Sequence, residues 1–116
     1  MAASKARRKT AISLSAVVAT GAGSTVDFGP TPVRNVVYFY KAATVTTGGT
    51  LKIQVSHDGT LWYDWQTIAI SATGDVAALV TNATAAENAL PRYWRANLSA
   101  RTDGTYTVYL GGTVDP

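Results

Sequence analysis

The sequence has no cysteine, one histidine and few charged side chains, and each shortage excludes a class of protein. Without cysteine there is no disulfide framework, no thiolate metal site and no cysteine nucleophile. Only 15% of the 116 residues are charged, which argues against a coiled coil, because coiled coils need charged residues beside their apolar seam. No apolar run reaches the roughly 18 residues of a membrane span. We therefore expect a binding or structural module rather than an enzyme.

The positive charge of the chain is concentrated at its N-terminus. Four of the ten basic residues lie in the first nine positions: Lys5, Arg7, Arg8 and Lys9. The first acidic residue is Asp27, and from residue 10 onward six basic residues stand against seven acidic ones. We divide the chain into a basic N-terminal arm, residues 1–9, and one folded domain, residues 10–116.

Alternation of apolar and polar residues dominates the domain, and no segment shows a helical stripe. The basic and apolar N-terminus resembles a secretory signal, but Ser13 and Ser15 interrupt its apolar stretch. A strand is the better interpretation, with four apolar residues on one face: Ile12, Leu14, Ala16 and Val18. The expected strands are 10–19, 25–28, 34–41, 50–56, 61–70, 75–80, 92–100 and 105–111. Residues 82–89 are the only candidate for a short helix.

Turn residues between these segments set the expected fold. Asp58-Gly59 and Asp103-Gly104 predict hairpins, because Asp and Gly tolerate the positive φ of a type I′ turn. About eight short strands in a chain of this length indicate an all-β fold. We expect an antiparallel two-sheet sandwich, jelly-roll-like or Ig-like, with an extended N-terminal arm. The order of the strands stays open.

The polar residues offer no convincing catalytic or metal-binding group. Ser56, His57 and Asp58 have the residue types of a catalytic triad, but neighbours in an extended chain point to opposite faces, whereas a triad converges. Most acidic residues fall in predicted turns, where solvated side chains are expected. Calcium at the Asp58 or Asp103 turn stays open as an alternative. We expect no catalytic residue, no metal and no cofactor.

Aromatic side chains form two groups that are candidates for a binding surface: Trp62, Tyr63, Trp65, Tyr93 and Trp94. Alternation places Trp62 opposite Tyr63 and Trp65, so at least one face of that strand is partly outside. Packing in the core or in a subunit interface is the favoured interpretation, and a glycan platform is the alternative.

The segment 51–65 contains Ser-His-Asp-Gly-Thr-Leu-Trp between two strands. It resembles a hairpin found in many small phage virion proteins, of the form strand, Ser-x-Asp-Gly-x-x-Trp, strand. It is also similar to discoidin-type carbohydrate- or lipid-binding sandwiches. The Asp-box of sialidases is similar too, but its glycine and tryptophan each lie one residue further along. Residues 14–29 are similar to the opening of the phage proteins, and residues 92–98 with 104–108 to their closing hairpin.

The resemblance implies a non-enzymatic virion structural protein, commonly a decoration, or cement, protein of the outer head surface. A tail or head–tail connector component is the alternative within this class. A carbohydrate-binding module using Trp62, Trp65 and Trp94 is the alternative from another class. The expected partners are the major capsid protein and further copies of the chain, as a trimer rather than a dimer. We expect synthesis in the host cytoplasm and no membrane partner. A nucleic-acid binder is the third alternative and rests only on the basic arm.

The basic arm lies outside these motifs and is interpreted from its chemistry. Ordering its backbone costs about 1–2 kcal/mol per residue, whereas exposed ion pairs return only about 0–1 kcal/mol each. We therefore expect the arm to add an extended segment to a neighbour's sheet edge. Its four cations, Lys5, Arg7, Arg8 and Lys9, would face acidic side chains of a capsid subunit or a sister chain.

Overall fold

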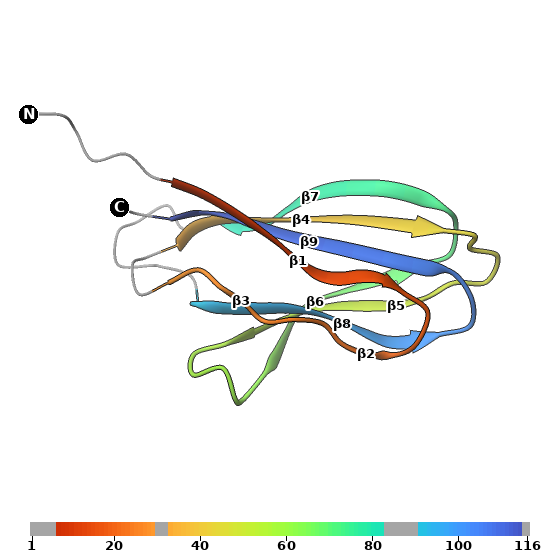
Figure 1. The fold of residues 1–116 in the computed structure, drawn as a ribbon, viewed down its shortest axis with the longest axis horizontal. Coiled ribbons are helices and arrows are strands. Elements are labelled where there is room, and N and C mark those ends of the chain that lie inside the picture. Colours follow the sequence, from red (N-terminus) through yellow and green to blue (C-terminus); the bar gives the residue numbers. More distant parts are fainter. Residues whose placement is uncertain (1–6, 30–32, 83–90, 115–116) are drawn as a thin grey trace, which may run out of the picture.

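Two antiparallel sheets pack face to face in the computed structural model, which describes residues 7–29, 33–82 and 91–114 (Figure 1). One sheet has four strands in the order β1-β9-β4-β7. The other has five, in the order β2-β8-β5-β6, with β3 also paired to β8. The predicted all-β two-sheet sandwich is therefore confirmed. No helix within the described segments is long and apolar enough to cross a membrane.

The strand boundaries follow the predicted segments closely, with one addition at Gly21–Ala22. In chain order the strands are β1 (Arg7–Val17), β2 (Gly21–Ala22), β3 (Val26–Asp27), β4 (Val33–Ala43), β5 (Gly49–Ser56), β6 (Tyr63–Ile70), β7 (Gly74–Asn82), β8 (Tyr93–Arg101) and β9 (Thr105–Val114). Strand β1 pairs with β9 from Arg7 onward, so residues 7–9 of the expected arm continue a strand of their own sheet. Of the candidate helix, residue 82 ends β7, and the rest lies outside the described residues.

The two Asp-Gly turns have different roles. Strands β5 and β6 pair with each other, so the hairpin predicted at Asp58-Gly59 is confirmed. Its loop spans residues 57–62, and in it only Gly59 has a positive φ (80°), so the predicted type I′ geometry is wrong. The hairpin at Asp103-Gly104 is also wrong, because β8 and β9 belong to different sheets. An Asp-Gly pair favours a chain reversal, whereas burial of the flanking strands selects their partners.

Bulges in β1 overturn the predicted alternation of its apolar residues. The register with β9 shifts on either side of Leu14, so Leu14 is buried while Ile12 and Val18 are exposed. Ser13 is buried with Leu14, and its Oγ accepts a hydrogen bond from the Ala96 N–H of β8 (2.9 Å). The predicted common face of Ile12, Leu14, Ala16 and Val18 is therefore wrong, since each bulge changes the phase of the strand.

Side chains from both sheets fill the core. The largest fully buried ones are Trp94, Tyr106, Leu51, Ile53, Leu98 and Leu110. Burial of such a side chain stabilises a fold by about 1.5–3 kcal/mol. The indole Nε1 of Trp94 donates a hydrogen bond to the Pro91 carbonyl oxygen (2.7 Å), so its polar atom is not left without a partner in the core.

Asp103 closes the corner where β4 passes to β5. Its carboxylate accepts hydrogen bonds from the backbone N–H groups of Thr46, Thr47 and Gly48, the shortest at 2.8 Å. These bonds, led by the one from Thr47, lower the pKa of Asp103 below its ordinary value. Asp103 therefore ties two loops together, where the sequence predicted a solvated turn residue.

Substitution of Gly48 by Ala should destabilise this corner. Gly48 has a φ of 104°, and an added Cβ would overlap the Ile70 carbonyl oxygen. We expect Gly48→Ala to lower the free energy of unfolding by about 2 kcal/mol or more, as measured by urea denaturation followed through tryptophan fluorescence. Gly74→Ala is the matched control, because nothing lies within 4 Å of its added Cβ; it should leave stability unchanged or raise it by up to about 1 kcal/mol. Equal stabilities would contradict the corner geometry.

Candidate interaction surface

The four predicted anchoring cations have separate positions. Lys5 lies outside the described residues. Arg7 begins β1, where its backbone pairs with that of Val114. Arg8 is exposed beside a groove on the outer face of the four-stranded sheet. Lys9 donates a hydrogen bond from Nζ to the Asp27 carbonyl oxygen of its own chain.

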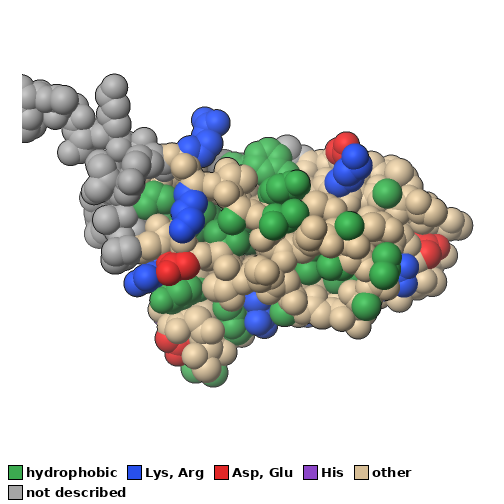
Figure 2. Space-filling model, in the orientation of Figure 1, with side chains coloured by type: hydrophobic (Ala, Val, Ile, Leu, Met, Phe, Trp, Pro, Cys, Tyr) green, Lys and Arg blue, Asp and Glu red, His purple; other side chains and the backbone are tan. Residues whose placement is uncertain are grey.

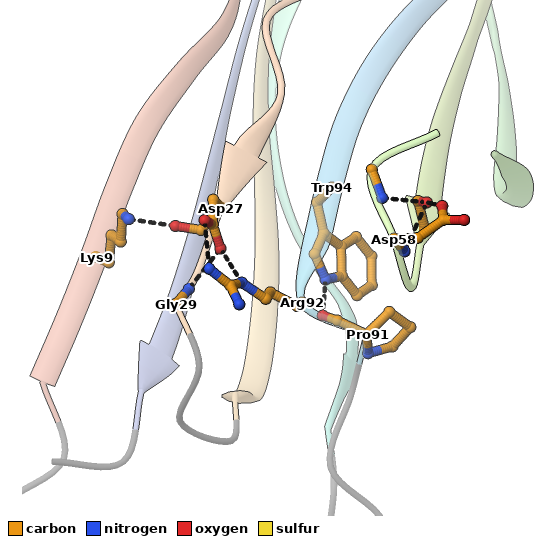
Figure 3. Close-up of polar contacts among 9 residues, drawn as sticks. Lys9, Asp27, Gly29, Asp58, Pro91, Arg92 and Trp94 are labelled. Carbon is orange, nitrogen blue, oxygen red and sulfur yellow. Dashed lines mark hydrogen bonds and ion pairs between the residues drawn. The ribbon is translucent and has the colours of Figure 1, made fainter. Parts of the chain in front are cut away.

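Asp27 of β3 connects this strand with the start of β8 (Figure 3). Its carboxylate accepts hydrogen bonds from Arg92 Nε (2.6 Å) and Nη2 (2.9 Å) and from the Gly29 N–H (2.8 Å). The Arg92 hydrogen bonds, followed by that of Gly29, lower the pKa of Asp27 to about 2. Both side chains of the ion pair are about 40% exposed (41% and 42%), so water screens the pair and its main effect is to orient the strands.

An apolar row crosses the outer face of the four-stranded sheet. Tyr109 of β9 lies opposite Ile12 of β1 on one side and Phe39 of β4 on the other. These three residues, the apolar row, are 43%, 39% and 41% exposed, respectively. Figure 2 shows hydrophobic side chains over much of the visible face, with one cluster near the upper edge of the molecule, where this sheet lies. Single exposed apolar side chains are common, but a contiguous row on a sheet face is typical of an interaction surface.

A groove flanks the row, because Gly111 brings no side chain to the outer face. It has a volume of about 440 Å³ and is lined by Arg8, Thr10, Asn35, Val37, Phe39, Gly111, Gly112 and Thr113. A second hollow of about 310 Å³ is lined by Phe39, Tyr40, Lys41, Asp75, Val76 and Tyr109. Phe39 therefore stands between two depressions that a partner's side chains can fill.

The five predicted aromatic residues do not form one platform. Trp94 is fully buried in the core. The ring of Trp65 lies 5.5 Å from that of Trp94 between centroids, yet Trp65 is 42% exposed and Tyr63 is 58% exposed. Trp62 lies under the Arg95 guanidinium, and Tyr93 lies under that of Arg92. The group is therefore divided: one residue packs in the core, two are exposed on β6, and two make cation–π contacts.

A polar ladder crosses the outer face of the five-stranded sheet. Arg95 Nε donates to Gln54 Oε1 (2.8 Å), and Gln54 Nε2 donates to Asp64 Oδ1 (2.8 Å). Lys52 Nζ donates to Asp64 Oδ2 (2.9 Å). The hydrogen bonds from Gln54 and then Lys52 lower the pKa of Asp64 below its ordinary value. The ladder joins β8, β5 and β6 on a face whose chemistry differs from that of the apolar row.

Ser56, His57 and Asp58 shape the β5–β6 loop. The buried Ser56 Oγ donates to Asp58 Oδ1 (3.0 Å) and accepts from the Gly59 N–H (2.8 Å). Asp58 Oδ1 also accepts from the Leu61 N–H (2.9 Å), while His57 is exposed. Across the described ranges, no three His, Asp or Glu side chains come together to hold a metal ion.

No protein-family model matches the chain, and no curated protein matches it. The apolar row was not among the residues predicted from sequence. Alternation with buried Val108 and Leu110 already puts Tyr109 on the outer face, and Gly111-Gly112 signals a place without side chains. Ile12 and Phe39 join Tyr109 only through pairing of strands distant in sequence, which no local pattern reveals.

The Asp27–Arg92 pair predicts a defined pH dependence. Because the pKa of Asp27 falls from 3.8 to about 2 on folding, its contribution to stability is full above the unfolded pKa and is lost as the pH falls through this window. In urea denaturation, the stability deficit of Asp27→Asn relative to wild type should be largest near neutral pH and should shrink as the pH falls from 3.8 towards 2. Arg92→Gln removes the other member of the pair, and its stability deficit should shrink over the same range of pH. A stability deficit of Asp27→Asn that does not change with pH would contradict the lowered pKa of Asp27.

Proposed function

We propose that this chain is a non-enzymatic structural protein of a phage virion that decorates the outer surface of the capsid. The observation that carries the proposal is the apolar row with its two flanking depressions on an outer sheet face. Protein interfaces combine such an apolar centre with a polar rim, and Arg8, Lys41 and Asp75 supply polar groups around it. The resemblance of residues 51–65 to a phage virion hairpin supports the same proposal.

The proposed mechanism is multivalent binding to the assembled shell. A ligand that binds the assembled shell but not its separated subunits stabilises the shell by mass action. Each copy then contributes modest contacts through the apolar row, and many copies together resist the outward pressure of packaged DNA. The proposed partners are the major capsid protein and sister copies in a trimer, which matches the local three-fold positions of an icosahedral shell. A tail or head–tail connector component is the alternative.

Copy counting on particles tests this proposal. Mass spectrometry of virions of the encoding phage should find the chain in hundreds of copies. Particles that lack the chain should rebind purified protein, and Phe39→Ser should reduce the bound copies about tenfold at limiting concentration, because a central apolar contact is worth about 1–2 kcal/mol or more.

Tyr63→Ser is the matched control for the rebinding assay. It makes a similar aromatic-to-serine change at an exposed position of the other sheet and should leave rebinding unchanged. A handful of copies per virion would favour the tail alternative, and absence from virions would contradict the proposal. Equal rebinding by both variants and wild type would remove the apolar row as the capsid-facing surface.

Glycan binding is a second candidate function. Tyr63 and Trp65 leave β6 with 58% and 42% of their side chains exposed, and exposed aromatic faces bind sugars. Trp65 belongs to the set expected from the sequence, whereas Tyr63 takes the place of Trp62 and Trp94. Trp94 is buried, and Trp62 already has a guanidinium 4.2 Å from its ring centre.

A glycan array distinguishes this candidate from the capsid proposal. If β6 is a glycan platform, wild-type protein should bind a defined set of glycans, and Tyr63→Ser should lose most of that binding. Phe39→Ser, which changes the opposite sheet, should bind the same glycans as wild type. Absence of binding by the wild type, or equal binding by all three proteins, would contradict a role for Tyr63 in glycan recognition.

A further inference from the structure

Arg95 is held firmly on the outer face of the five-stranded sheet, yet much of its guanidinium is unused. Its Nε donates to Gln54 Oε1 (2.8 Å), and its Cζ lies 4.2 Å from the centre of the Trp62 ring. It alternates along β8 with the buried Trp94 and Ala96. Among the residues that the structure describes, neither Nη group of Arg95 donates a hydrogen bond to any acceptor. Four N–H groups on a planar fork therefore remain for another molecule.

The fixed position of this guanidinium lowers the cost of binding a ligand. An arginine that is free in water loses side-chain freedom when it binds, about 0.5–1.5 kcal/mol for a flexible side chain. The bond to Gln54 and the contact with Trp62 have already removed much of that freedom. Partial burial lowers the pKa of Arg95 below its ordinary value, but a guanidinium keeps its proton at neutral pH.

The charges around Arg95 select the charge of the ligand. Asp64 is engaged by Lys52 and by Gln54, so its carboxylate is already paired. Arg95, Lys52 and Asp64 together carry a net charge of +1, which one monoanion neutralises. A phosphate with two negative charges would leave this group of residues with a net negative charge, and the Asp64 carboxylate would repel it. A carboxylate also matches the planar fork of an arginine through two parallel hydrogen bonds.

We propose that Arg95, supported by Trp62, binds a single carboxylate, and that this carboxylate belongs to a Glu or Asp side chain on a partner protein. Tryptophan and arginine are enriched among the residues that dominate protein–protein binding energy. The two hollows described above, of about 310 and 440 Å³, lie on the four-stranded sheet, and Arg95 lines neither of them. The guanidinium covers one face of Trp62, so that face cannot stack on a sugar. The carboxylate site does not rest on the proposed capsid role, because it uses the opposite sheet.

Titration of the full chain with small probes tests the site directly. The probes are N-acetylglutamate N-methylamide, whose single carboxylate is that of a glutamate side chain, and the matching glutamine derivative, which is neutral. Nuclear magnetic resonance of the arginine Nε–H and tryptophan Nε1–H groups reports on Arg95 and Trp62. We expect the glutamate probe to shift both signals saturably, with a dissociation constant in the millimolar range, and the glutamine probe to leave them unchanged.

Variants distinguish the contribution of the planar Arg95 guanidinium from that of its positive charge. Arg95→Lys keeps the charge but loses the planar fork, so it should bind the glutamate probe about tenfold more weakly. Lys41→Gln removes one positive charge from the opposite sheet and should bind the probe as wild type does. Thermal melting verifies that each variant is folded; should Arg95→Lys not fold, Trp62→Leu, which removes the stacked ring, should weaken probe binding instead.

Any one of four results would overturn the assignment of this site. Equal affinity of wild type and Arg95→Lys, or absence of saturable shifts in wild type, would exclude a carboxylate site at Arg95. Tighter binding of inorganic phosphate than of the glutamate probe would exclude the choice of a monoanion. Binding of N-acetylneuraminate at least tenfold tighter than the glutamate probe would place the carboxylate on a glycan rather than on a protein. None of these titrations involves capsids, so the capsid proposal can fail or succeed separately.

Discussion

Burial of Trp94 between the two sheets sets the geometry of one end of the sandwich. The indole is fully enclosed, and its N–H is satisfied by Pro91. Because side chains alternate along a strand, fixing Trp94 inward fixes Arg95 outward over Trp62. The burial of Trp94 therefore determines that Arg95 points outward, and the polar ladder on the outer face depends on that orientation.

Glycine determines shape at the other face. Within β9, a Cβ on Gly112 would lie 2.8 Å from the Phe28 ring in the core, whereas Gly111 faces the opposite direction and leaves the groove beside Phe39. Two adjacent glycines thus serve opposite needs: one permits close packing of the sheets, and the other creates a depression on the surface. The same strand buries Leu110 and exposes Tyr109, so β9 contributes to both the core and the apolar row.

Four of the described acidic residues have specific hydrogen-bond partners. Asp58 and Asp103 accept backbone N–H groups that shape two loops, while Asp27 and Asp64 pair with cations. None of these four carboxylates accepts a hydrogen bond from Arg95, whose Nε donates to Gln54 instead. As a result the two outer faces differ in kind: one is an apolar row between depressions, and the other is a hydrogen-bonded ladder with a guanidinium that can accept a partner.

The sequence alone determined the all-β class, most strand positions and the hairpin at Asp58-Gly59, because period-two alternation and turn residues act locally. The same alternation separates Tyr109 from Leu110, which lie on opposite faces of β9. Tertiary structure decided the rest. The Asp103-Gly104 turn joins two sheets, the bulges of β1 bury Ser13, and residues 7–9 continue β1 because β9 offers a pairing partner. The apolar row and the Arg95–Trp62 contact bring together residues far apart in sequence. Local patterns fix which way a side chain points, whereas its neighbour across the sheet depends on which strands pair.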